Sequence, residues 1–214
     1  ADPGNREKVI LVPESKNRIG AVMVVGGGIA GIQAALDLAD SGFYVYLIEK
    51  TAGIGGTMAR LDKTFPTDDC ASCIILPKLV ECGRHLNIEL ITLAQVETVQ
   101  GTAGHFTIQV RKDPRYIDMN KCIACGLCAQ KCPINVKDEF NFGINNKKAV
   151  YIKYDQSVPL KYAIEPSACL YFTLGKCRAC ETFCPTGAVN FSQVRERVTI
   201  DVGAVILAPG FKPF

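Results

Sequence analysis

The stretch Ile19–Gly31, with the sequence IGAVMVVGGGIAG, decides the fold of the first part of the chain. It begins as an apolar run of strand length and passes directly into glycines that fit the pattern G-x-G-x-x-G at Gly26, Gly28 and Gly31. The first glycine permits a tight turn, the second lets a pyrophosphate approach the backbone, and the third lets a helix pack on the strand. We therefore expect a strand, a phosphate-binding turn and a helix, in that order.

The residues after this turn complete a dinucleotide-binding unit. A helical pattern stops at Gly42, a strand is predicted over Val45–Ile48, and Glu49 stands at its end. In such a unit the phosphates meet free N–H groups at the helix N-terminus, and the acid accepts hydrogen bonds from the adenosine ribose. A glycine-rich turn in an α/β protein without a dinucleotide is the alternative. The full order of strand, turn, helix, strand and acid favours the dinucleotide.

Two further features favour FAD over NAD. Gly53–Gly56 resembles the second glycine cluster that FAD enzymes of the disulfide-reductase type place beside the pyrophosphate. Near the C-terminus, Val198–Leu207 is predicted as a strand pair running into Ala208–Gly210, which resembles the turn by which such domains return to the cofactor. The chain contains no Gly-Asp, the motif that usually closes such a site, so we expect the rest of the site on other sequence or in a partner protein. The predicted cofactor contacts are Gly26, Gly28, Ile29, Ala30, Gly31, Glu49, Lys50, Gly55, Gly56 and Gly210.

The second half of the chain contains two cysteine runs with the spacing of iron–sulfur ligands. Cys122–Pro133 has the pattern C-x2-C-x2-C-x3-C-P, which matches the bacterial ferredoxin run. Cys169–Pro185 has the same ending after a first gap of seven residues, so we expect Leu170–Lys176 to loop out. Zinc also binds paired cysteines, but two Cys-Pro endings after three-residue gaps are not a zinc pattern. The runs therefore predict two [4Fe–4S] clusters.

Crosswise ligation sets the predicted ligands, because the fourth cysteine of each run belongs to the other cluster in two-cluster ferredoxins. One cluster is assigned Cys122, Cys125, Cys128 and Cys184. The other is assigned Cys132, Cys169, Cys177 and Cys180.

Three more cysteines lie between the two halves, and they leave three alternatives open. Cys70 and Cys73 form C-x-x-C and are candidates for a redox dithiol beside the flavin. Together with Cys82 and an outside ligand, they are also candidates for a third cluster. The third alternative is that all three are inert buried thiols. His85 and His105 have no partner visible in the sequence, so we expect structural or surface roles.

The composition excludes several classes of protein. A net charge of +3, with scattered Lys and Arg, gives no indication of a nucleic-acid partner. No apolar stretch approaches the roughly 20 residues of a membrane span, and no signal peptide opens the chain. Eleven cysteines, mostly at short gaps, suit metal centres in a reducing compartment better than disulfides, so we expect an oxygen-sensitive, cytoplasmic protein.

These observations predict an α/β Rossmann-type FAD domain of the disulfide-reductase type, interrupted by an α+β ferredoxin-like domain with two [4Fe–4S] clusters. The FAD domain is expected over residues 19–115 and 193–214, and the insert over 116–192. Residues 1–18 are expected to be an N-terminal extension. Residues 87–93 and 105–111 alternate like strands of a small sheet.

The motifs together resemble the A-subunit family of heterodisulfide reductases. The resemblance lies in Lys63–Cys73 (KTFPTDDCASC), Pro77–Leu79, Gly83–His85 and the embedded ferredoxin run, and it covers residues 19–214. The flavin subunits of the quinone-interacting oxidoreductase complex are close relatives of that family. Members generally run past the Ala-Pro-Gly turn, so we expect a fragment or a short form.

The resemblance implies an oxidoreductase subunit that passes electrons between FAD and [4Fe–4S] clusters to partner subunits of an anaerobic complex, in some members with electron bifurcation. Its candidate electron donors are a ferredoxin, a hydrogenase or a formate dehydrogenase. Two alternatives stay open: an electron-carrier module of the ferredoxin type with an incomplete flavin site, and a flavin disulfide reductase acting through Cys70 and Cys73.

Overall fold

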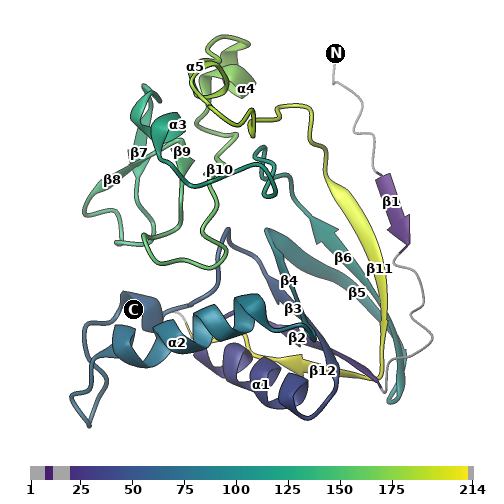
Figure 1. The fold of residues 1–214 in the computed structure, drawn as a ribbon. Helices are drawn as coiled ribbons and strands as arrows, with labels where there is room; N and C mark the ends of the chain where they lie inside the picture. Colours follow the sequence, from purple (N-terminus) through teal and green to yellow (C-terminus); the bar gives the residue numbers. More distant parts are fainter. Residues whose placement is uncertain (1–7, 12–19, 212–214) are drawn as a thin grey trace. The chain divides into compact units, whose positions relative to one another are not determined.

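A computed structural model describes residues 8–11 and 20–211, which form two compact units (Figure 1). The first unit runs up to Pro114 and resumes at Val194, and the second spans Arg115–Gln193. Of the N-terminal extension predicted over residues 1–18, β1 (Lys8–Leu11) is described and the rest lies outside the described residues.

A parallel sheet forms the centre of the first unit. It contains β2 (Ala21–Val25), β3 (Tyr44–Glu49), β4 (Ile88–Thr92) and β12 (Ala204–Leu207), in the order β12-β2-β3-β4. All three neighbouring pairs are parallel. β12 comes from the far end of the chain and lies beside β2, so the C-terminal segment completes the sheet. This sheet confirms the predicted Rossmann-type fold.

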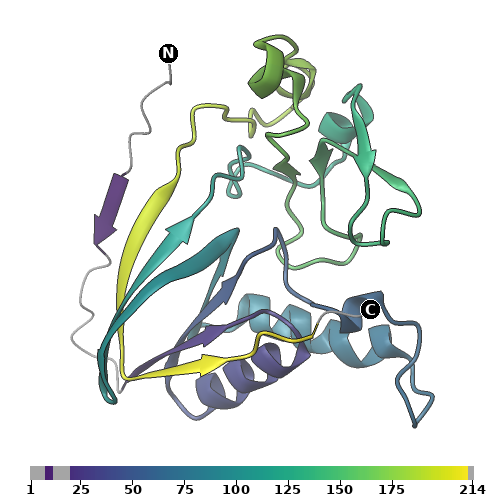
Figure 2. The same cartoon turned by 180° about the vertical axis from the view of Figure 1, so that it is seen from behind.

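Helices cover one face of this sheet, as Figures 1 and 2 show from opposite sides. α1 (Ile29–Asp40) connects β2 to β3, and its buried residues recur at helical spacing. α2 (Ala71–Arg84) packs against α1 and follows the short 3-10 turn η1 (Met58–Arg60). Burial of one apolar stripe on each helix therefore holds α1 and α2 in a layer on this face of the sheet.

A second sheet covers the opposite face of the parallel sheet. It contains β5 (Ala94–Thr102), β6 (His105–Lys112) and β11 (Glu196–Val202), with β1 at the edge, in the order β1-β11-β6-β5. Apolar side chains from both sheets form one core cluster. Its members include Met23, Tyr46, Ile48, Ile108, Val110 and Ile200. The first unit thus has three layers.

Two predicted pairings in this unit are wrong. Residues 87–93 and 105–111 do not share a sheet, because β4 joins the parallel sheet and β6 the other one. Leu93, with a φ of 55°, turns the chain from the first sheet into the second. Residues 198–207 do not form a strand pair either, since β11 and β12 lie in different sheets. The chain passes between them at Gly203, whose N–H donates to the carbonyl of Ala21 at 2.8 Å.

The second unit has little regular structure. β7 (Asn135–Lys137) pairs with β8 (Asn146–Lys148), and β9 (Val150–Tyr151) pairs with β10 (Ala163–Ile164). Its helices are α3 (Leu127–Gln130), α4 (Leu170–Leu174) and α5 (Ala179–Thr182). Cysteines form much of its buried core, together with Ile117, Ala149, Val150, Ile164, Ala188 and Phe191. The predicted loop at Leu170–Lys176 is largely wrong, because α4 occupies it and ends at Gly175 in the left-handed conformation.

Candidate iron–sulfur and flavin sites

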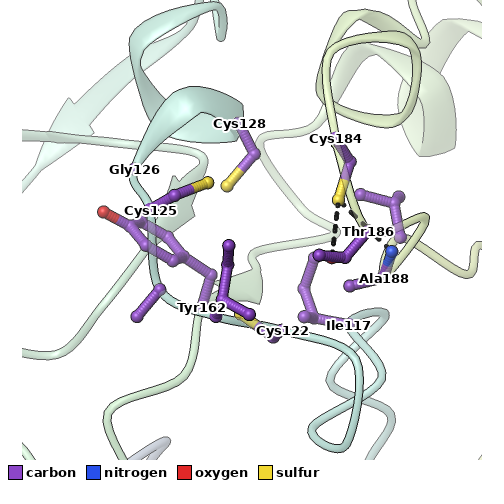
Figure 3. A pocket seen from close by; sticks show the side chains of 12 residues that line it. Ile117, Cys122, Cys125, Gly126, Cys128, Tyr162, Cys184, Thr186 and Ala188 are labelled. Atoms are coloured by element: carbon purple, nitrogen blue, oxygen red, sulfur yellow. Dashed lines mark hydrogen bonds between the residues drawn. The ribbon is translucent and has the colours of Figure 1, made fainter.

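Four cysteines from both ends of the second unit surround one hollow (Figure 3). They are Cys122, Cys125, Cys128 and Cys184. The hollow encloses about 320 Å³ of space, part of it open to solvent. These are the four residues that the sequence pattern assigned to one cluster.

A second hollow holds the other four cysteines of the two runs. Its lining includes Cys132, Cys169, Cys177 and Cys180, and it encloses about 310 Å³. Each hollow thus takes three cysteines from one run and the fourth from the other. This crossing ties the two runs together, so neither site can form without both halves of the unit.

Local backbone geometry directs the thiols into the hollows. Gly126 has a φ of 83° and precedes α3, which carries Cys128. Ala124 and Cys177 also have positive φ values, of 56° and 78°, which is uncommon for residues other than glycine. Such conformations cost free energy and persist where surrounding structure requires them. The backbone is therefore bent to aim side chains at each site.

Burial keeps two of the thiols protonated as long as no metal binds them. It raises the pKa of Cys128 to about 12, and the pKa of Cys180 to about 12 as well. Cys125 and Cys177 are exposed. Because a thiolate and not a thiol binds metal, loading these sites must release protons and depends on pH.

A single metal ion and an iron–sulfur cluster require different arrangements of their ligands. Within residues 8–11 and 20–211, no three His, Cys, Asp or Glu side chains converge tightly enough to hold one metal ion. Zinc draws four sulfurs to about 2.3 Å from one centre. A [4Fe–4S] cluster is held by four cysteines spread around its body. Each hollow offers the four cysteines that one such cluster would need.

The glycine segments of the first unit lie against each other. The Gly55 N–H donates to the Gly27 carbonyl at 2.7 Å. A Cβ at Gly56 would lie 2.8 Å from the Gly28 Cα, and a Cβ at Gly26 would collide with the Ala208 carbonyl. The backbones thus approach as closely as glycine permits. Ala208 belongs to the predicted return turn Ala208–Gly210, although it was not among the predicted cofactor contacts, and it forms part of this contact.

The start of α1 offers backbone donors beside these glycines. Among the described residues no side chain caps this helix, and its first turn contains no acid. Its first N–H groups, which include those of Ile29 and Ala30, therefore suit an anionic group such as a pyrophosphate. Lys50 is exposed just beyond β3. Gly210 has a φ of 69°, and no described atom lies within 4 Å of a Cβ placed on it.

Glu49 is buried and holds the glycine segment from within. Its Oε2 accepts the Gly27 N–H at 2.9 Å, and its Oε1 accepts the Thr51 N–H at 2.8 Å. The side chain therefore shapes the turn whether or not it also binds a ribose. That ribose contact stays a prediction.

The three middle cysteines do not form one site. Cys70 and Cys73 form a disulfide at the start of α2. Cys82 lies nine residues further along the same helix, about 13 Å away along its axis and on the opposite face. It is buried, and burial raises the pKa of its thiol to about 12. The trio predicted as candidate ligands of a third cluster is therefore separated.

The two histidines have structural or surface positions. His85 caps the C-terminus of α2, its Nε2 lies 3.2 Å from Asp40 Oδ1, and its Nδ1 accepts the Asn87 N–H at 3.1 Å. His105 is exposed at the start of β6. No helix among the described residues is long and apolar enough to cross a membrane.

Comparisons with known proteins agree with both units. Residues 21–69 match the family of FAD dependent oxidoreductases, and residues 115–138 match the 4Fe-4S binding domain. The chain is 48% identical over 208 residues to the iron-sulfur A-subunit of the CoB–CoM heterodisulfide reductase of Methanocaldococcus jannaschii, covering 97% of this chain and 30% of the relative. It is 48% identical over 192 residues to the A-subunit of the H(2):CoB-CoM heterodisulfide,ferredoxin reductase of Methanothermobacter marburgensis, covering 90% and 28%. The chain thus spans under a third of these relatives.

Two solved structures match parts of this chain with TM-scores below 0.5. L-proline dehydrogenase from P. horikoshii has a TM-score of 0.41 at 23% identity, covering 50% of this chain and 20% of that one. The bacillithiol disulfide reductase Bdr from Bacillus cereus has a TM-score of 0.33 at 18% identity, covering 44% and 34%.

Proposed function

We propose that this chain, which belongs to the A-subunit family of heterodisulfide reductases over the segment it spans, carries electrons between FAD and two [4Fe–4S] clusters within a larger oxidoreductase complex. One observation carries the proposal: the eight cysteines of the two runs surround two hollows in two sets of four. This arrangement requires both runs, which is the ligation pattern of two-cluster ferredoxins.

The thiols have a defined task in this function. Each set of four would hold one cluster, and the apolar side chains around it limit the access of water. Short helices α3 and α5 pack together, and Cys180, once ionised, would raise the pKa of Cys128. These two thiols, one from each set, are therefore neighbours, which suits electron transfer from one cluster to the other.

The first unit would bind the flavin through its backbone. The glycine segments leave room for a pyrophosphate, the N-terminus of α1 donates hydrogen bonds to it, and Glu49 keeps the turn in shape. A bound flavin supplies two-electron chemistry on one side and single-electron transfer on the other. The protein adjusts potentials through burial and hydrogen bonds.

The complex around this chain is part of the proposal. Both of the relatives described above are named as single subunits of a reductase, so we propose further subunits as partners. A ferredoxin, a hydrogenase or a formate dehydrogenase is the proposed electron donor, and bifurcation at the flavin is the proposed mode. The density of free thiols suits the reducing conditions of the cytoplasm.

The proposal is tested by anaerobic purification of the 214-residue chain, with iron, acid-labile sulfide and flavin measured per chain. We expect about eight iron and about eight sulfide, as two [4Fe–4S] clusters require, with bound FAD. About four iron would reject the two-cluster assignment. Zinc in place of iron would overturn the electron-transfer function altogether, and iron without flavin would reduce the chain to an electron carrier.

A further inference from the structure

Both hollows have mostly apolar linings, and they differ in which residues carry hydroxyl groups. Besides its cysteines, the first hollow is lined by two residues with hydroxyl groups, Tyr162 and Thr186 (Figure 3). The second is lined, besides its cysteines, by apolar residues: Pro133, Ile134, Val150, Leu170 and Ala179. The Thr186 hydroxyl of the first hollow therefore has an apolar counterpart in the second, the side chain of Ile134.

The difference is sharpest at the two cysteines that precede proline. The Cys184 Sγ accepts the Ala188 N–H at 3.2 Å and lies 3.7 Å from the Thr186 hydroxyl oxygen, as Figure 3 shows. The Cys132 Sγ occupies the equivalent place in the other run, and it instead lies 3.8 Å from a carbonyl oxygen, that of Ile134. One sulfur faces hydrogen-bond donors and the other faces an acceptor.

These contacts act on the reduction potential in opposite directions. Reduction adds one negative charge to a cluster and its ligands. Donors that point at a ligand sulfur stabilise the reduced form and raise the potential, whereas an apolar lining and a carbonyl oxygen lower it. The two equivalent positions, Thr186 and Ile134, differ in this respect although the cysteine patterns around them match.

Charged side chains flank both hollows and do not reverse this order. Lys121 precedes Cys122 in the sequence, and Lys161 donates to the Cys122 carbonyl. Beside the second site in the sequence lie Lys131, Lys176 and Arg178, but the charge of Arg178 is balanced by Glu181 at 2.6 Å. Two lysines therefore remain beside each site in the sequence, and the contacts of the two sulfur atoms distinguish the sites.

We propose that the cluster held by Cys122, Cys125, Cys128 and Cys184 has the higher reduction potential, and that the Thr186 hydroxyl raises it. This inference rests on the proposed function. With both clusters bound, one electron would pass from the cluster held by Cys132, Cys169, Cys177 and Cys180, which would be oxidised by one electron, to the cluster held by the other four cysteines, which would be reduced by one. The unit would conduct in a preferred direction.

The test exchanges the two equivalent side chains. The whole chain is purified anaerobically as wild type, Thr186→Val and Ile134→Thr, and the two midpoint potentials are measured by titration followed with electron paramagnetic resonance. We expect Thr186→Val to shift the higher midpoint downward and leave the lower one in place. Ile134→Thr should shift the lower midpoint upward. Both variants should therefore reduce the difference between the two midpoint potentials. Thr186→Ser keeps a hydroxyl, so it should retain both wild-type midpoint potentials.

Each outcome has a distinct meaning. A wild-type chain with fewer than about eight iron contradicts the proposed function before any potential is measured. A full complement of iron with unchanged midpoints in both variants contradicts the present inference alone. If Thr186→Val lowers the lower midpoint, the order of the two clusters is wrong. If Thr186→Val loses its clusters, the Ile134→Thr variant still tests the inference: an upward shift of the lower midpoint potential supports it, and an unchanged midpoint contradicts it.

Discussion

The carboxylate of Glu49 and the backbone N–H of Gly27 are joined by a hydrogen bond of 2.9 Å across 22 positions of the sequence. The bond connects the end of β3 to the turn between β2 and α1, and Thr51 holds the other carboxylate oxygen. The acid is thus a brace inside the cofactor turn. Its removal should therefore disturb the turn even before a ligand binds.

Glu49→Gln should weaken FAD binding and destabilise the first unit. A glutamine offers one carbonyl oxygen, so one of the two backbone N–H groups that Glu49 accepts loses its partner. A buried unsatisfied donor costs about 1–3 kcal/mol. The measurements are FAD titration and the thermal midpoint. Glu89→Gln is the matched control, because its amide oxygen can still accept the Tyr44 hydroxyl. Equal losses in both variants would contradict a specific role for Glu49.

Gly56→Ala should abolish FAD binding. The φ of Gly56 is +57°, and its new Cβ would lie 2.8 Å from the Gly28 Cα, so the two glycine segments must separate. Gly104→Ala is the control, since Gly104 has a φ of +94° and no described atom within 4 Å of the added Cβ. The control carries backbone strain of roughly 1–2 kcal/mol without the collision. Retained FAD affinity in Gly56→Ala would show that the close approach is unnecessary.

Cys73→Ser should leave the iron content unchanged, because Cys70 and Cys73 pair with each other and lie far from Cys82. Mass spectrometry after alkylation should find these two thiols modified only after treatment with a dithiol reductant. Cys82, which is buried, should resist alkylation in the folded chain. A loss of about four iron on Cys73→Ser would reinstate a third cluster at this site.

Cys82 should make the stability of the first unit fall at high pH. Burial raises the pKa of its folded thiol from 9.0 to about 12, so the unfolded chain loses this proton first. The stabilisation is complete below pH 9.0 and is lost as the pH rises toward about 12. The free energy of unfolding should fall by at most about 1.4 kcal/mol per pH unit because of this thiol. Urea unfolding of wild type and Cys82→Ala between these limits measures it. If the free energy of unfolding depends on pH in the same way in both proteins, Cys82 is not the cause of the loss of stability.

Local pattern was sufficient for the elements that depend on local chemistry. The glycines at 26, 28 and 31 and the apolar stripe behind them predicted the turn and α1, since a tight turn and an amphipathic helix are properties of adjacent residues. The cysteine spacings predicted which thiols would gather, because two runs with known crossing leave one arrangement of four and four.

The pattern of apolar and polar residues could not predict which strands pair when they lie far apart in the sequence. Apolar and polar residues alternate in the same way in β4 and in β6, as they do in many strands. This alternation therefore could not show that the two strands belong to different sheets. The chain passes from one sheet to the other at Leu93 and again at Gly203. At each of these positions the backbone N–H donates a hydrogen bond to a residue far away in the sequence. The contact of Ala208 with Gly26 likewise exists because β12 lies beside β2.

The sequence by itself determined which cysteines gather and where the glycine turn forms, because cysteine spacing and glycine conformation belong to single residues at fixed positions. Tertiary structure alone decided that Glu49 braces the turn, and that Thr186 and Tyr162 line one hollow while apolar residues line the other. These facts concern which groups meet across long stretches of chain. Only the packing of the whole unit brings such groups within hydrogen-bond distance.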